Sequence, residues 1–267
     1  MNTIKLKAIA RSILNSIFGI FGIDVYFCWK SNKYDRVLLD LNAMNSFYSS
    51  NERVQLYYEG MKKTNVVYSD NIYKKLRYYG YQQVLENILA KEIDGDIAEC
   101  GVWKGHSAYI WAKLLSMNDF KGEFHIFDSF EKSLSEFQAE DTNVRFPDNK
   151  KEIVNMRELF VSTEEEVKKN LAEFKFIKYY DGWIPERFHE VSDRRFSFVH
   201  IDCDLYQPTV ASLSFFYPRL SKGGCIAISA YGLTQVPGSK KAVDQFLSNE
   251  NYTMFFEIPS SGSLLIK

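Results

Sequence analysis

The sequence contains little of what marks disulfide-bonded, metal-binding or nucleic-acid-binding proteins. Its four cysteines form no Cys-x-x-Cys pair, and its four histidines show no spacing typical of metal ligands. We therefore expect buried, reduced cysteines and a cytoplasmic location. The formal net charge is −1, whereas binding to phosphate backbones needs a surplus of lysine and arginine. The composition thus argues against nucleic acid as a partner.

The sequence also lacks an apolar run of the length that crosses a bilayer. The uncharged run at residues 12–23 falls short of the roughly 20 residues required. Within residues 4–23 apolar side chains recur on one helical face, after Lys5, Lys7 and Arg11. Two interpretations stay open. The segment packs on this chain or on a second copy in a homo-oligomer, or it makes peripheral contact with the inner face of the membrane.

Apolar and aromatic residues, by contrast, are plentiful. They include 17 Tyr and 21 Phe, and 46% of the 267 residues are hydrophobic. That is enough for the core of one α/β domain with an appendage. We predict an N-terminal helical extension over residues 1–65 and a folded domain over residues 66–267.

The most informative stretch is residues 94–107, Asp-Gly-Asp-Ile-Ala-Glu-Cys-Gly-Val-Trp-Lys-Gly-His-Ser. Apolar residues lead into Glu99, Gly101 and Gly105 follow, and a helical apolar pattern comes next. This order predicts the first strand–turn–helix unit of a doubly wound sheet. Glycine at 101 lets the backbone approach a ligand closely, and glycine at 105 lets a helix pack closely on a strand. The acid argues against a bound pyrophosphate.

Further apolar runs predict the other strands of this sheet. They are residues 123–128, 176–180, 196–204 and 225–229, with 253–258 and 263–266 as a closing β-hairpin. A helix over residues 66–92, capped by Ser69 or Asp70, is expected to cover the ligand cleft, and a capping box of Ser162 and Glu165 opens another helix. The expected fold is α/β, a mostly parallel Rossmann-like sheet of seven strands with a C-terminal antiparallel hairpin.

Carboxylates stand at the ends of the predicted strands. Asp128 lies 29 residues beyond Glu99 (128 − 99), where an acid in an open α/β sheet hydrogen-bonds ribose hydroxyls. Taken alone, Asp128 is explained equally well as a turn former. Asp202 and Asp204 end the fourth strand. Because alternate residues of a strand face opposite ways, we do not expect these two to act on one ligand.

Four blocks of sequence carry a family likeness. They are residues 95–105, Asp128-Ser129-Phe130, Asp-Cys-Asp-Leu-Tyr at 202–206 and Tyr-Pro-Arg-Leu-Ser-Lys-Gly-Gly at 217–224. In this order they resemble class I S-adenosylmethionine-dependent methyltransferases. More narrowly, they resemble the macrocin O-methyltransferase (TylF/MycF) family, whose members methylate sugar hydroxyls on natural products. The likeness covers residues 66–267.

The resemblance implies S-adenosyl-L-methionine as the cofactor and assigns it a set of residues. These are Glu99, Gly101, Gly105 and Ser107 at the methionine end, Asp128 and Ser129 at the ribose, and Asp181 and Gly182 near the adenine. Asp202 would stand at the reaction centre.

One segment departs from the family pattern. Family members commonly end the fifth strand in Asp-Asp-Tyr-Gly, whose acids help to bind a divalent cation, whereas this chain has Ser-Ala-Tyr-Gly from Ser229 to Gly232. Mg²⁺ prefers several hard oxygen ligands, and Ala230 offers none. We therefore predict no tight divalent-metal site. A general base would remove the acceptor proton, with Asp202 as the first candidate and His200 as the second.

Three functions follow from these features. The leading hypothesis is an O-methyltransferase that acts on a hydroxyl of a sugar, a glycan or a natural-product small molecule. The alternative is a catalytically reduced relative that binds cofactor or a partner in a structural role. A nucleotide-binding oxidoreductase is disfavoured, because the glycine pattern is Glu-x-Gly-x-x-x-Gly rather than Gly-x-Gly-x-x-Gly and the chain ends in a hairpin.

Overall fold

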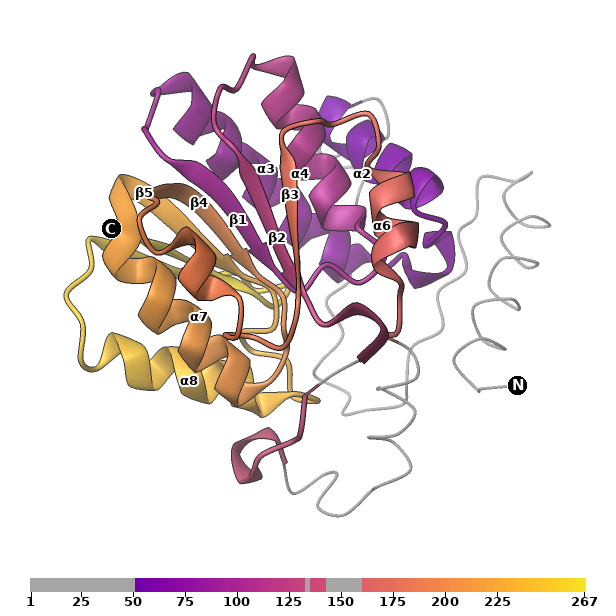
Figure 1. Ribbon diagram of the computed structural model, residues 1–267. Coiled ribbons are helices and arrows are strands. Elements are labelled where there is room, and N and C mark those ends of the chain that lie inside the picture. Colours follow the sequence, from indigo (N-terminus) through magenta and orange to yellow (C-terminus); the bar gives the residue numbers. More distant parts are fainter. Residues whose placement is uncertain (1–50, 133–134, 143–159) are drawn as a thin grey trace, which may run out of the picture.

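The computed structural model describes residues 51–267 apart from 133–134 and 143–159. In this part of the chain seven strands form one sheet in the order β3-β2-β1-β4-β5-β7-β6 (Figure 1). The strands are β1 Asp96–Cys100, β2 Phe124–Asp128, β3 Ile177–Asp181, β4 Phe196–Ile201, β5 Leu220–Ile228, β6 Met254–Glu257 and β7 Ser263–Ile266. The first five are parallel, and β7 pairs antiparallel with both β5 and β6. The predicted doubly wound sheet with its closing hairpin is confirmed.

Helices cover both faces of the sheet (Figure 1). One face carries α2 Glu52–Lys63, α3 Ile72–Ala90, α4 His106–Met117 and α6 Glu164–Asn170; the other carries α7 Tyr206–Arg219 and α8 Pro237–Leu247. Short 3₁₀ turns lie at Val67–Ser69, Phe130–Lys132, Ala139–Asp141 and Phe188–Val191. This two-sided cover explains the continuous apolar runs of the central strands, because strands buried on both faces have no solvent side.

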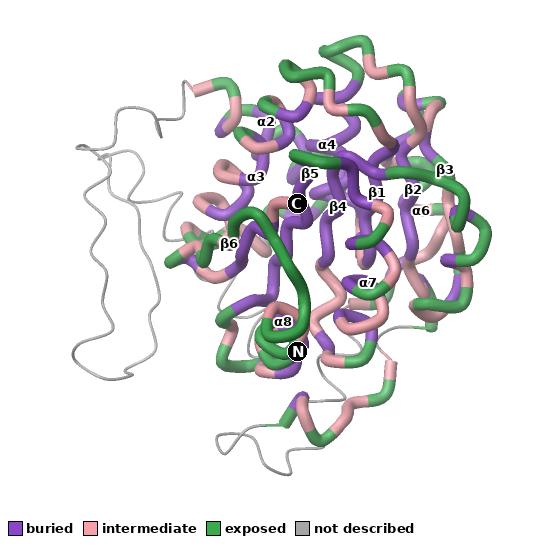
Figure 2. The backbone as a smooth tube through the Cα atoms, turned by 90° about the vertical axis from the view of Figure 1, so that its left-hand side faces the viewer, coloured by how far each residue is buried: buried purple, intermediate pink, exposed green. Residues whose placement is uncertain are grey.

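The core is divided by the sheet into two apolar layers. One layer joins α2, α3 and α4 to the sheet and contains Trp111 and Phe198; the other lies under α7 and contains Phe127 and Phe216. All four side chains are almost wholly buried, and the burial is visible along the central strands in Figure 2. Burying one such side chain stabilises the fold by roughly 1.5–3 kcal/mol, so the aromatic residues of these two layers contribute substantially to its stability.

Several local predictions are wrong in detail. The N-cap of α3 is Asn71, whose side chain accepts the Lys74 N–H, rather than Ser69 or Asp70. The N-cap of α6 is Thr163, because Ser162 instead donates to the Trp103 carbonyl. Adjacent polar residues compete for such caps, and tertiary contacts decide between them. Strand β5 also begins at residue 220 instead of 225, and β4 ends at residue 201 instead of 204.

Helix α2 lies on the N-terminal side of the predicted boundary at residue 65. Its Leu56, Tyr57 and Met61 belong to the same apolar layer as α3 and α4, so this helix is part of the domain core. The predicted amphipathic segment, residues 4–23, lies outside the described residues. Within the described ranges, no helix has both the length and the apolar character needed to cross a bilayer.

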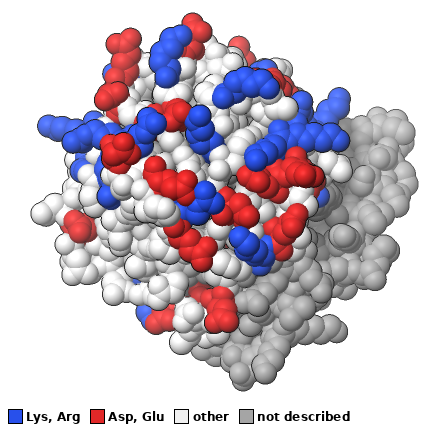
Figure 3. Space-filling model, viewed as in Figure 1, with Lys and Arg blue, Asp and Glu red and all other residues white. Residues whose placement is uncertain are grey.

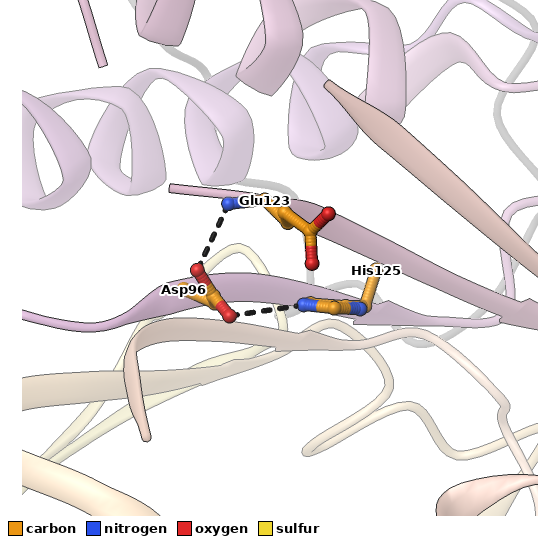
Figure 4. Close-up of side chains that lie close together, drawn as sticks. All are labelled: Asp96, Glu123 and His125. Carbon is orange, nitrogen blue, oxygen red and sulfur yellow. Dashed lines mark hydrogen bonds and ion pairs between the residues drawn. The ribbon is translucent and has the colours of Figure 1, made fainter. Parts of the chain in front are cut away.

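A polar network ties the amino ends of the central strands together (Figure 4). Asp96 accepts hydrogen bonds from the Glu123 amide at 2.8 Å and from His125 Nε2 at 3.1 Å, and Arg194 lies 3.3 Å away. Glu123 in turn pairs with Arg194 and Lys178. Burial alone raises the pKa of Asp96, but the hydrogen bonds and the charges of His125 and Arg194 outweigh it and lower that pKa.

These three ligand-type side chains, Asp96, Glu123 and His125, lie within 4.8 Å of one another, yet Arg194 and Lys178 already neutralise the carboxylates. The cluster therefore serves as a structural ion-pair network at the edge opposite the strands' carboxyl ends.

We expect Asp96→Asn to lower the free energy of unfolding by about 1–3 kcal/mol at pH 7, because it leaves buried donors without a charged acceptor. The folded pKa of Asp96 lies below its unfolded value. The contribution of Asp96 to the stability of the folded state is therefore present above the unfolded pKa, and it is lost as the pH falls through the folded pKa. Urea unfolding at pH 7 and below pH 4 measures this effect. The difference in free energy of unfolding between wild type and variant should be smaller in acid. Glu250→Gln, at an exposed position, is the control, and a gap independent of pH would contradict this account.

Candidate functional site

A cavity of about 350 Å³ opens at the carboxyl ends of β1, β2 and β4. Residues from the turn after each of these strands line it, together with the first turns of α3 and α4. The residues used below are Lys74, Arg77, Tyr78, Gly101, Val102, Trp103, His106, Ser107, Asp128, Ser129, Trp183, Ile184, Asp202 and Asp204. This is the edge at which open parallel sheets bind their ligands.

The turn after β1 requires glycine at two places for different reasons. Gly101 has φ +83°, and a Cβ there would lie 2.5 Å from the Asp202 carbonyl oxygen. Gly105 has φ +88° and caps α4, but a Cβ there would meet only ordinary contacts of 3.5 Å or more. Gly105 therefore supplies a left-handed backbone conformation, which corrects the expectation that it allows close helix packing.

Asp128, the last residue of β2, holds this turn through hydrogen bonds to its backbone. Its Oδ2 accepts the Val102 and Trp103 amides at 2.6 and 3.1 Å, and its Oδ1 accepts the Phe130 amide at 2.7 Å. Burial raises the pKa of Asp128, and the three backbone donors act against that rise. Two carboxylate oxygens offer about four acceptor positions, so capacity remains for a ligand hydroxyl. The turn-former and ligand-binding explanations are therefore compatible.

Glu99 is not part of the cavity lining and belongs to a fully buried hydrogen-bond network. Its Oε1 is 2.7 Å from His200 Nδ1, while His200 Nε2 is 2.7 Å from the Ser229 hydroxyl. Both Glu99 and His200 have exposed fractions of 0%. Burial raises the pKa of Glu99, opposed by His200. Glu99 Oε2 is buried and has no partner at normal hydrogen-bond geometry, while the Ser107 hydroxyl lies near enough to Glu99 to lower its pKa.

The structure does not support His200 as a general base. Its ring is wholly buried, both nitrogens are engaged, and it is not among the residues that line the cavity. A general base must reach the proton that it removes, directly or through one water. His200 instead holds Glu99 in place.

Asp202 and Asp204 both line the cavity, so the expectation that they face opposite ways is wrong. The premise was wrong, because residues two apart in a strand face the same side. In addition, β4 ends at Ile201 and Asp204 has φ +60°, so neither aspartate lies within the strand. Burial and the neighbouring charge of Asp202 raise the pKa of Asp204 to about 7, while Arg77 acts against the rise. Asp204 therefore holds its proton across a range in which an ordinary aspartate is ionised.

Two cations that sequence reasoning missed project from α3 into the same cavity. Arg77 is only 9% exposed; it donates to Ser261 Oγ, and its Nε has no hydrogen-bond partner. Burial and the charge of Arg77 lower the pKa of Lys74 to about 8, while Asp202 and Asp70 act to raise it. The missed signal was helical spacing, since residues 74, 77 and 78 lie on one face of α3.

The predicted site residues divide into two groups. Those that line the cavity are Gly101, Ser107, Asp128, Ser129 and Asp202. Those outside its lining are Glu99, Gly105, Asp181, Gly182 and His200. Asp181 pairs with Lys132 at 3.1 Å on the surface, and the Gly182 amide donates to the Asp128 carbonyl. The next two residues, Trp183 and Ile184, do reach the cavity and provide flat or apolar surfaces for an aromatic ring.

The residues present fit a nucleoside cofactor. The cavity offers apolar walls at one end, a carboxylate with spare acceptor capacity at Asp128, and an unused buried acceptor on Glu99 beneath its floor. A divalent cation fits less well. Ser229 and Ala230 are each 1% exposed, Ser229 is bonded to His200, and Asp202 and Asp204 share the cavity lining with Lys74 and Arg77.

We expect Asp204→Asn to flatten the pH dependence of stability between pH 5 and 8. The folded pKa of Asp204, about 7, lies well above the ordinary value of an aspartate. The folded state therefore binds the extra proton, and stability falls as the pH rises through this window and levels off above it. Melting temperatures of wild type should drop more steeply from pH 5 to 8 than those of the variant. Asp193→Asn, on the surface, should keep the wild-type slope; equal slopes for all three would refute the assignment.

Comparison with known proteins supplies the family. The model of the Macrocin-O-methyltransferase (TylF) family matches residues 42–258. Demethyldecarbamoylnovobiocin O-methyltransferase of Streptomyces niveus is 25% identical over 175 residues, which make up 64% of this chain and 64% of that protein. Mycinamicin III 3''-O-methyltransferase of Micromonospora griseorubida is 24% identical over 175 residues, 64% of this chain and 67% of that protein. The match to the first of these thus spans less than two thirds of its length.

Solved structures agree on the fold. The O-methyltransferase NovP aligns with a TM-score of 0.63 at 20% identity, covering 80% of this chain and 98% of that one. An O-methyltransferase from Bacillus cereus in complex with SAH aligns with a TM-score of 0.50 at 12% identity, covering 85% and 97%. Since the family match covers most of the residues, the chain belongs to the macrocin O-methyltransferase (TylF) family.

Proposed function

We propose that the protein is an S-adenosylmethionine-dependent O-methyltransferase that acts on a hydroxyl of a sugar, a glycan or a natural-product small molecule. The observation that carries the proposal is the cavity at the carboxyl edge of the sheet, with Asp128 and Asp202 inside it, in a chain of this family. Two of the relatives are named as O-methyltransferases of mycinamicin III and of a rhamnosyl tetracenomycin.

The cofactor would extend across the ends of β1 and β2. Gly101 and Ser107 border the cavity next to the unpartnered Glu99 Oε2, which suits the ammonium of a methionine group. Asp128 is placed for the ribose hydroxyls. Trp183 and Ile184 would contact the adenine, with Asp181 and Gly182 in the turn behind them.

When bound, the cofactor supplies an electrophilic methyl group on a sulfonium. The acceptor oxygen would form its new bond to that methyl carbon as the carbon–sulfur bond breaks and S-adenosylhomocysteine leaves, and Asp202 would take up the hydroxyl proton. The Tyr78 hydroxyl, 3.4 Å from Asp202 Oδ2, fixes the orientation of the carboxylate. A positioned base of this kind contributes about 10²–10⁴-fold to the rate.

The molecular surface suits a small acceptor better than a nucleic acid. On the visible face of the described residues, lysine and arginine alternate with aspartate and glutamate (Figure 3). Phosphate backbones are bound by surface stripes of positive charge.

A cytoplasmic homo-oligomer, with membrane contact through residues 4–23, stays a prediction. Deleting residues 1–24 should reduce co-sedimentation with anionic liposomes, and unchanged binding would refute the membrane contact.

We expect Asp202→Asn to bind S-adenosylhomocysteine with an affinity within about threefold of wild type, a small free-energy change. Methyl transfer should fall by about 10²–10⁴-fold, because the amide cannot take up the proton. Calorimetry with S-adenosylhomocysteine and with NAD measures the first effect. Methyl transfer is measured in cells that lack the native gene and carry either the wild-type or the Asp202→Asn gene. Mass spectrometry of their glycan and metabolite extracts would show the defect as one lost methyl group.

Asp193→Asn should restore the methylated product in the same cells. Binding of NAD in place of S-adenosylhomocysteine would overturn the proposal. Binding of S-adenosylhomocysteine without any methylated product from the wild-type gene would support the structural alternative.

A further inference from the structure

We propose that Lys74 is a catalytic residue that takes the place of a divalent cation at the acceptor end of the cavity. Its ammonium would hold the acceptor oxygen and stabilise the negative charge that develops there. The inference rests on the proposed methyl transfer. It goes beyond that proposal by assigning the charge-stabilising group to the chain itself.

The carboxyl end of β5 cannot contribute to a metal site. The Ser229 hydroxyl is used by His200 Nε2 at 2.7 Å, and the Ala230 side chain has no ligand atom. Among the described residues, the grouping of three or more ligand-type side chains lies at the opposite edge, around Asp96. Of the three carboxylates that line the cavity, Asp128 already accepts three backbone amides, so Asp202 and Asp204 are left without a third free carboxylate ligand.

Lys74 is built into this end of the cavity. It lies in the first turn of α3, where its own amide is held by the Asn71 cap. Its Nζ is 3.4 Å from Ser69 Oγ and 5.6 Å from the centre of the Tyr78 ring. The same Tyr78 donates its hydroxyl to Asp202 at 3.4 Å. Tyr78 thus connects the ammonium and the proposed base.

Lys74 and Asp202 interact electrostatically but make no direct ion pair within 4.0 Å. Both face the cavity, so an acceptor oxygen can lie between them and contact each. In that position Asp202 accepts the hydroxyl proton while the ammonium donates to the oxygen. Charge that develops in a site shielded from water is stabilised strongly by a fixed cation. Arg77, whose Nε has no hydrogen-bond partner, acts electrostatically on Asp204 and opposes the rise of its pKa.

The experiment measures Mn²⁺ binding to the full-length protein at pH 7 by electron paramagnetic resonance. Lys74 and a divalent ion would compete for the same carboxylates. Wild type should therefore bind Mn²⁺ weakly, and Lys74→Gln should bind it at least about tenfold more tightly, because a repelling charge has been removed. Lys74→Arg keeps the charge and should behave as wild type. Lys75→Gln is the matched control, since this neighbouring lysine bonds to Tyr58 outside the cavity.

Calorimetry with S-adenosylhomocysteine verifies that each variant is folded and separates the two proposals. Failure of wild type to bind it would overturn the proposed function, whereas the Mn²⁺ result tests Lys74 alone. Tight Mn²⁺ binding by wild type would overturn the inference, as would equal affinities for wild type and Lys74→Gln. In deletion cells, Lys75→Gln should restore the methylated product and Lys74→Gln should not.

Discussion

The main-chain contact between the turn after β1 and the turn after β4 is the constraint on which the site depends. The Asp202 amide donates to the Cys100 carbonyl at 2.8 Å, and the Gly101 amide donates to the Phe127 carbonyl at 2.8 Å. These bonds join three strand ends so closely that a Cβ on Gly101 would lie 2.5 Å from the Asp202 carbonyl oxygen. Asp128 and Asp202 reach the same cavity because the turns after β1 and β4 approach each other so closely at Gly101. A larger residue at 101 would force the two turns apart and separate the carboxylates.

The sequence was sufficient for the architecture because the strands and the glycine turn are encoded locally. Apolar runs, β-branched residues and acids at strand ends recur in an order that few folds share. The site was harder to predict. Asp204 reaches the cavity through a left-handed backbone conformation, and in a residue other than glycine such a conformation is imposed by surrounding structure. The contribution of Lys74 and Arg77 depended on which face of α3 meets the sheet, and an apolar pattern as weak as that of α3 does not decide this.

The two ends of the sheet use the same residue types for opposite purposes. At the amino end Asp96 is saturated by a histidine, an arginine and a backbone amide, and its lowered pKa reflects a carboxylate that stabilises the fold. At the carboxyl end the polar groups are only partly satisfied. Glu99 keeps an unused oxygen, Arg77 an unused nitrogen, and Asp204 a raised pKa. Buried polar groups without partners are costly, so this end is arranged for a ligand that completes its hydrogen bonds.

The change at the end of β5 is connected to the buried histidine beneath the site. His200 Nδ1 lies 2.7 Å from Glu99 Oε1 and accepts the Trp111 indole N–H at 3.3 Å, while Nε2 lies 2.7 Å from the Ser229 hydroxyl, so both ring nitrogens are engaged. A second carboxylate in place of Ser229 would put two acids on one imidazole in a pocket closed to water. Burying that additional charge would be unfavourable without a cation to neutralise it. A neutral residue at 229 therefore adds no further charge to the histidine–glutamate pair, and in the proposed mechanism the positive charge near the acceptor comes from α3. The loss of the acids and the presence of Lys74 are, on this argument, two parts of one electrostatic arrangement.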